Sequence, residues 1–176
     1  MIKTILYPTD LGLNGAVLLQ HVIELASRYQ AQIVALHAVE PLGVFADAVL
    51  ETYIPPDMIG DLRSFGMPAV MEAIRQQVIE AFEEEFIDLN VSSGRVRDVR
   101  VVRGSPAEVI LEQQKLLKAD LIVMGACSAD ASHLGALGST ASKVLQRSTV
   151  PVYLVPTVGQ KNTNQAFLPA ARRNSR

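Results

Sequence analysis

Residues 119–155 read ADLIVMGACSADASHLGALGSTASKVLQRSTVPVYLV, and this stretch decides the fold. Its first part, Leu121–Met124, is an unbroken apolar run, which is typical of a strand covered on both faces. Gly125 ends the strand, and a loop of small and polar residues follows. Gly138–Thr140 then opens a segment whose apolar residues have helical spacing, and Val150–Val155 predicts one more short strand.

The start of this last helix has the chemistry of an anion site. The first N–H groups of a helix have no partner inside the helix, and together with the helix dipole they favour phosphate. Glycine lets a phosphate approach the backbone closely. The candidate residues are Gly125, Gly138, Ser139 and Thr140. A simpler interpretation is also open, in which the glycines are turn residues that need a positive φ and the hydroxyl residues only cap the helix.

The composition is that of an ordinary folded domain. Of the 176 residues, 49% are hydrophobic and 19% are charged, which excludes an intrinsically disordered chain. The net charge of −2 gives no basic character that would indicate a nucleic-acid partner. No apolar run approaches the roughly 20 residues of a membrane span, and no secretory signal is expected. The single cysteine, Cys127, excludes an intramolecular disulfide framework, so we expect a cytoplasmic protein.

The rest of the chain alternates strand and helix. Further strands are expected at Ile2–Tyr7, Gln32–Val39 and Val96–Arg103. Further helices are expected to begin after Asn14, at Pro68 and after Ser105. Ser105 and Glu108 have the spacing of a capping box, with proline between them at the first helical position. The charges on Val96–Arg103 and the proline at position 151 place these two strands at the edges of a sheet.

This alternation predicts an α/β protein with one Rossmann-like, open, five-stranded parallel sheet and helices on both faces. In such sheets, ligands bind beyond the carboxyl ends of the strands, where the strand order reverses. The first strand ends in Pro8-Thr9-Asp10 and the fourth ends in Gly125, so these two loops should meet. The architecture therefore predicts a site where the residues suggest one.

Several of these residues follow the pattern of a known family. Gly125 is followed after two residues by Ser128, and after nine more by Gly138-Ser139. This resembles the motif of nucleotide-binding universal stress proteins, which is Gly, two residues, Gly, nine residues and then Gly-Ser or Gly-Thr, although serine replaces the second glycine. Three further segments also resemble the nucleotide-binding members of this family: Ile5–Asp10, Val101–Pro106 and Val123–Gly125. The likeness covers nearly all of Met1–Pro156.

The resemblance implies a ligand, ATP or AMP, with or without Mg²⁺. It also implies that Asp10 contacts the ribose or a metal ion and that the backbone of Val39 meets the adenine. The implied binding residues are Pro8, Thr9, Asp10, Val39, Met124, Gly125, Ser128, Gly138, Ser139 and Thr140. At position 128 the side chain either crowds the phosphates or replaces a contact with its hydroxyl. The alternative to a ligand-binding role for Asp10 is that its side chain only forms an Asx turn.

Other polar residues near the loop have ordinary alternatives. Cys127 is either a reactive thiol or simply a small residue. The three histidines do not form a metal-binding cluster, and of His21, His37 and His133 only the last is expected to reach a ligand. Lys143 either adds charge to the phosphate pocket or is a solvated surface residue.

Binding is better supported than turnover, because no dedicated general base is visible and no other phosphate or nucleophile motif is present. The first function class is a nucleotide-binding regulatory protein of the stress response, whose bound state alters an unknown partner protein. The second is a homodimeric scaffold that has kept the fold and lost the ligand. A slow ATPase is a third.

Three further expectations concern segments outside the motif. A homodimer should form through the edge strand Val150–Val155, because an exposed apolar edge is usually paired. Residues Glu40–Gly66 carry many apolar side chains and should form an ordered lid or interface element. Residues 157–176 should form a flexible polar tail.

Overall fold

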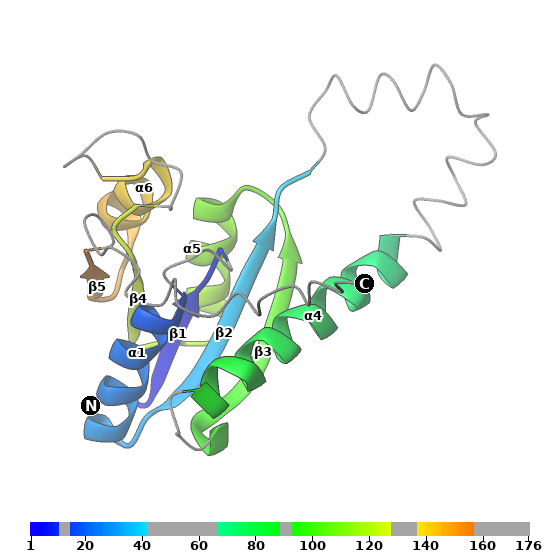
Figure 1. Ribbon diagram of the computed structural model, residues 1–176. Helices are drawn as coiled ribbons and strands as arrows, with labels where there is room; N and C mark the ends of the chain where they lie inside the picture. The colour runs from blue at the N-terminus through cyan, green and yellow to red at the C-terminus, as the bar shows by residue number, and fades with distance from the viewer. Residues whose placement is uncertain (11–14, 42–66, 89–92, 128–136, 157–176) are drawn as a thin grey trace, which may run out of the picture.

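The computed structural model of the protein describes residues 1–10, 15–41, 67–88, 93–127 and 137–156. At its centre lies a five-stranded sheet in the order β3-β2-β1-β4-β5 (Figure 1). The strands are β1 (Thr4–Pro8), β2 (Gln32–Val39), β3 (Val96–Arg103), β4 (Leu121–Gly125) and β5 (Val152–Val155). All neighbouring strands pair in parallel, so the predicted α/β fold is confirmed.

The strand order reverses between β1 and β4. From β1 the chain adds β2 and then β3 on one side, and it returns to add β4 and β5 on the other side. Strands β3 and β5 therefore form the two edges, as their charges and proline predict. The register pairs Ile5 with Leu121 and Leu6 with Ile122, which brings the carboxyl ends of β1 and β4 side by side.

Helices cover both faces of the sheet. The helical segments are α1 (Gly15–Tyr29), α4 (Met67–Asp88), the short 3₁₀ segment η2 (Ser93–Arg95), α5 (Pro106–Leu116) and α6 (Ser139–Arg147). Helices α1 and α4 lie on one face, and α5 and α6 lie on the other (Figure 1). None of the helices among the described residues is long and apolar enough to cross a bilayer.

The two faces of the central strands bury alternate residues, as the period of two in a strand requires. Buried side chains on the α1 and α4 face include Ile5, Tyr7, Ile33, Ala35 and Val123. Those on the α5 and α6 face include Leu6, Val34, Leu36, Ile122 and Met124. Because both sets are apolar, the central strands read as unbroken apolar runs in the sequence.

The predicted capping box at α5 is wrong. Ser105 is the N-cap residue, but its side chain makes no capping hydrogen bond. The Glu108 carboxylate instead binds the guanidinium group of Arg147 at the end of α6, with Oε2 3.1 Å from Nη2. A two-point contact between the carboxylate and the guanidinium cation is stronger than a single hydrogen bond from a backbone N–H to the carboxylate, so the tertiary partner takes the glutamate.

Several predictions fall on segments outside the described residues. These are the cap at Asn14, most of the Glu40–Gly66 segment, Ser128 with the rest of the loop to residue 136, and the tail at 157–176. The lid, the tail and the role of Ser128 therefore stay predictions.

Candidate functional site

A pocket of about 300 Å³ lies at the carboxyl ends of the central strands. Its walls come from the ends of β1, β2 and β4 and from the first turns of α1, α5 and α6. This is the position at which the strand order reverses, and it is where ligands bind in open parallel sheets. The lower limit of common ligand pockets is also about 300 Å³, so the space suits one small molecule.

The structure brings most of the sequence-predicted residues together in this pocket. Those that line it are Pro8, Thr9, Asp10, Met124, Gly125, Gly138, Ser139 and Thr140. Val39 is not among the lining residues; the last residue of β2 that lines the pocket is Ala38. The Val39 carbonyl instead accepts a hydrogen bond of 2.9 Å from the Gly104 N–H. Ser128 lies outside the described residues.

One end of the pocket is formed by the N-terminus of α6. The N-cap residue, Gly138, donates its N–H to the Ala126 carbonyl at 2.8 Å, which holds the helix start against the end of β4. As a glycine, the N-cap residue has no side chain that could cap the helix. Within the part of the chain that the structure describes, the N–H groups of Ser139 and Thr140 have no hydrogen-bond acceptor. Unpaired N–H groups and the positive end of the helix dipole make this a favourable place for a phosphate.

The backbone at Gly138 favours the binding interpretation over the turn interpretation. Its φ is −59°, which every amino acid can adopt, so no positive φ requires glycine here. Among the described residues, the only glycine with a positive φ is Gly104, at +154°. A Cβ on Gly138 would lie 3.4 Å from the Ala126 oxygen and the Cys127 Cα, which is ordinary contact. Glycine at 138 therefore serves close approach to the pocket better than it serves a turn.

The opposite end of the pocket contains His37, which the sequence analysis did not place near a ligand. His37 is half-buried at the end of β2, and its Nδ1 lies 2.9 Å from the Thr9 carbonyl oxygen. The Thr9 N–H in turn donates to the Leu36 carbonyl at 2.9 Å, which ties the end of β1 to the end of β2. The signal available in the sequence was the position of His37 near the carboxyl end of a predicted strand.

A sequence profile of the universal stress protein family matches residues 1–156. The chain belongs to the universal stress protein family. A universal stress protein of Thermus aquaticus, encoded 3′ to the QAH/OAS sulfhydrylase, is 30% identical over 130 residues, which are 74% of this chain and 81% of that protein. The stress response protein NhaX of Bacillus subtilis is 32% identical over 106 residues, which are 59% of this chain and 60% of NhaX.

Solved structures of other proteins share the fold at low sequence identity. Hypothetical protein MJ0577 aligns with a TM-score of 0.65 and 23% identity, over 93% of this chain and 99% of that one. A universal stress protein solved in complex with cAMP aligns with a TM-score of 0.55 and 20% identity, over 89% of this chain and 98% of that one. At such identities the likeness establishes the fold.

Within this universal stress protein, Gly104 positions one wall of the pocket. A Cβ at Gly104 would lie 2.7 Å from Cγ2 of Val109, too close for any side chain. Because the residue also has a positive φ, glycine is required there for two independent reasons. The tight turn starts α5 beside β2, and this places Pro106 and Ile110 in the apolar wall.

The chemistry of the pocket suits binding. Its described lining residues include one carboxylate, Asp10, and no lysine or arginine. Among the described residues, no group of three or more histidine, cysteine, aspartate or glutamate residues could hold a metal ion. A magnesium ion at Asp10 would therefore take most of its ligands from phosphate oxygens and water, which is how magnesium commonly binds with nucleotides.

Proposed function

We propose that this universal stress protein binds an adenine nucleotide, ATP or AMP, in the pocket at the ends of β1, β2 and β4. The observation that carries the proposal is that Ser139 and Thr140, whose N–H groups have no acceptor among the described residues, line the same pocket as the apolar wall. A phosphate at α6 and a base against that wall would use both ends of one cavity.

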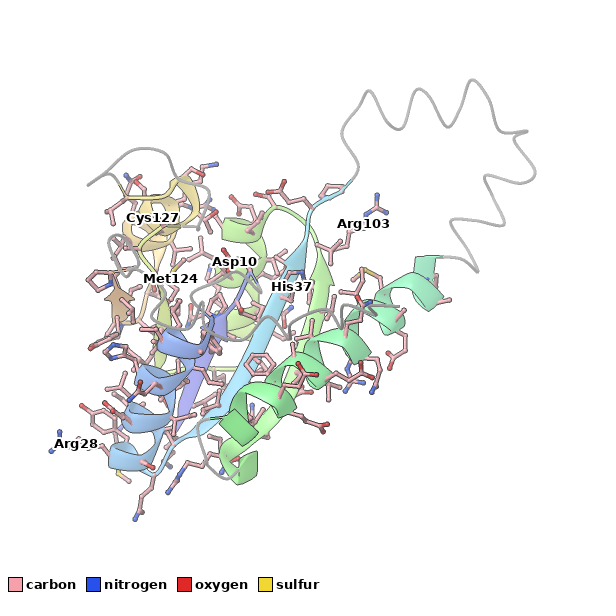
Figure 2. The ribbon with its side chains drawn as sticks, in the orientation of Figure 1. Asp10, Arg28, His37, Arg103, Met124 and Cys127 are labelled. Atoms are coloured by element: carbon pink, nitrogen blue, oxygen red, sulfur yellow. The ribbon has the colours of Figure 1, made fainter. Side chains whose placement is uncertain are left out.

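The arrangement of the lining residues supports this orientation. The base would pack against Leu36, Ile110 and Met124, which are buried. Asp10 follows β1, which lies between β4, the strand that leads to α6, and β2, the strand that carries His37 (Figure 2). It lines the pocket and would accept hydrogen bonds from the ribose hydroxyls. The cAMP complex of a protein with the same fold supports a nucleotide as the class of ligand.

We assign the chain a regulatory role and not a catalytic one. Binding of the nucleotide would change the population of a state that a partner protein recognises, in the stress response that gives the family its name. Asp10 is the only carboxylate among the described lining residues, and the proposal gives it to the ribose, or to a magnesium ion, and not to proton transfer.

Titration calorimetry with adenosine, AMP and ATP tests the proposal. The wild-type protein should bind AMP and ATP, and Gly138→Val should weaken both, because its branched side chain would occupy the space at the helix start. Adenosine has no phosphate, so its affinity should be nearly the same in the two proteins. Gly138→Ala, whose Cβ makes only ordinary contacts, is the control for folding. If none of the three ligands binds to the wild type at millimolar concentration with magnesium, the chain is a scaffold that does not bind nucleotide.

A further inference from the structure

A second cavity, of about 410 Å³, lies at the opposite end of the sheet from the proposed nucleotide pocket. It is lined by the carboxyl ends of α1 and α4, the start of β2 and the short segment η2, which all lie at the amino ends of the strands (Figure 1). The proposed function makes no use of this cavity, whose volume is within the range of small-molecule sites. Its walls include Ile23, Ser27, Gln32, Ile33, Phe86 and Arg95.

The inner wall of the cavity is apolar. Ile33 at the start of β2 and Phe86 near the end of α4 are buried, and Ile23 of α1 packs against the same core. The ring centroids of Phe86 and Phe82 are 6.5 Å apart, so the aromatic part of the wall is held in place by the core. Such a surface suits an aromatic or branched apolar group, because binding removes the apolar area of both from water.

Arg95 is the only charged residue among the described residues that line this cavity. Its side chain is half-buried, and no carboxylate in the described part of the chain forms an ion pair with it. Arg75 and Arg100, the other half-buried arginines that the structure describes, each pair with a carboxylate. A guanidinium group that has lost part of its hydration without gaining an anion favours a ligand that supplies one.

The carboxyl ends of α1 and α4 offer Arg95 a simpler role, because a cation stabilises the negative end of a helix dipole. Two of the last carbonyl groups of α1 are already bonded, however. The Ala26 carbonyl accepts from the Ala31 N–H at 2.9 Å, and the Ser27 carbonyl accepts from the Gln30 N–H at 3.4 Å. Among the described residues, the Arg95 side chain donates no hydrogen bond to either helix, so its donors are left for a ligand.

We propose that this cavity binds a small carboxylate with an apolar body, at a site separate from the nucleotide pocket. The planar guanidinium group of Arg95 would hold both carboxylate oxygens, and the apolar body would lie against Ile33 and Phe86. Ser27 and Gln32, which are exposed lining residues, add polar groups at the cavity mouth. This inference goes beyond the proposed function and does not depend on it.

Phenylacetate is a suitable probe, and phenylacetamide is its neutral counterpart of nearly the same shape. In titrations followed by protein NMR, we expect phenylacetate to bind with a dissociation constant of about 1 mM or lower. Phenylacetamide should bind at least about tenfold more weakly, because it cannot form the charge-assisted pair. The resonances that shift should be those of Ile23, Ile33 and Phe86, and not those of Met124 and Thr140 in the proposed nucleotide pocket.

Three variants separate recognition of the carboxylate from general charge effects. Arg95→Gln should weaken phenylacetate binding at least about tenfold and leave phenylacetamide binding nearly unchanged. Arg95→Lys keeps the charge without the planar fork, so its affinity for phenylacetate should be intermediate. Arg97→Gln is the matched control, because it removes the same charge from an exposed residue that is not among the lining residues, and it should bind phenylacetate as the wild type does.

Several outcomes would overturn the inference. These are the absence of any shift at the cavity resonances at about ten times the expected dissociation constant, equal affinities for the two probes, or wild-type binding of phenylacetate by Arg95→Gln. If the wild type does not bind phenylacetate and Arg95→Gln lowers the melting temperature, Arg95 serves the helix ends and the inference is wrong. None of these results bears on adenine-nucleotide binding, so the proposed function would stand or fall by its own titrations.

Discussion

Arg147 at the end of α6 binds both carboxylate oxygens of Glu108 in the first turn of α5. The two residues are 39 positions apart in the sequence, and each is more than half exposed. The contact joins α5 and α6, two of the three helices whose first turns line the pocket. It also replaces the local capping role that Glu108 has in the sequence pattern.

We expect this ion pair to make stability depend on pH in mild acid. The hydrogen bond from Arg147 lowers the pKa of Glu108 in the folded protein below its ordinary value. The contribution is therefore complete above the ordinary glutamate pKa of about 4.3, and it is lost as the pH falls through the lower, folded value. Urea denaturation at neutral and acidic pH should show a steeper loss for the wild type than for Glu108→Gln. Because the pair is exposed, the difference should be small and should shrink in high salt; a difference that grows with salt would contradict this account.

Asp120 should provide a second, independent source of acid sensitivity. Its Oδ2 accepts hydrogen bonds from the N–H groups of Lys3 and Thr4, at 2.8 and 3.0 Å, and these bonds lower its pKa. Stability from Asp120 is complete above the ordinary aspartate pKa of about 3.9 and disappears as the pH falls through the lower value. We expect Asp120→Ala to cost about 1–2 kcal/mol at neutral pH in urea denaturation and much less at the acid end. If Asp120→Ala lowers the free energy of unfolding equally at neutral and at acidic pH, the charge of the carboxylate is unimportant.

The same substitution to alanine should have a large effect on stability at Gly104 and a small one at Gly138. Gly104→Ala should destabilise the fold by about 2–4 kcal/mol, because it combines a positive φ with a clash against Val109. Adding Val109→Ala should recover only part of this loss, since it removes the clash and not the backbone strain. Gly138→Ala should change stability by less than about 1 kcal/mol. Thermal unfolding of the four proteins measures these differences, and a mild effect at Gly104 would mean that the turn relaxes.

Replacing Ser128 should change which nucleotide is preferred. In the family motif this position is glycine, and a missing Cβ leaves room near the terminal phosphate. Ser128→Gly should shift the preference among AMP, ADP and ATP towards ATP, as measured by titration calorimetry with and without magnesium. Ser132→Gly makes the same substitution elsewhere in the loop and should leave the preference unchanged. A uniform change in the affinity for all three nucleotides would argue that Ser128 does not contact the terminal phosphates.

We propose that two copies of the chain pair through β5. The opposite edge is protected, because Arg75 donates from Nε to the Val99 carbonyl of β3 at 3.1 Å and Arg97 is exposed. Strand β5 has no charged residue, and Tyr153 is 40% exposed. Tyr153→Lys should convert a dimer into a monomer in light scattering, whereas Arg97→Glu on β3 should not. A monomeric wild type at micromolar concentration would overturn the proposal.

Much of the fold could be predicted because it depends on local patterns. The apolar run Leu121–Met124 indicates a strand buried on both sides, and the glycine and hydroxyl residues after it indicate a helix start suited to phosphate. Charges on β3 and the proline before β5 predict edge strands, because a buried central strand tolerates neither. Each of these signals depends on what one segment can bury or hydrogen-bond.

The tertiary structure alone decided which distant groups meet. His37 reaches the pocket because β2 pairs directly with β1, whereas Val39, whose carbonyl is bonded to Gly104, is not among the lining residues. Glu108 turns away from the cap because α6 brings Arg147 within reach. Such contacts depend on strand order and helix placement, and a pattern of neighbouring residues carries no information about a partner on another element. The sequence therefore determined the sheet, its edges and the helix start, and the packing determined the far end of the pocket.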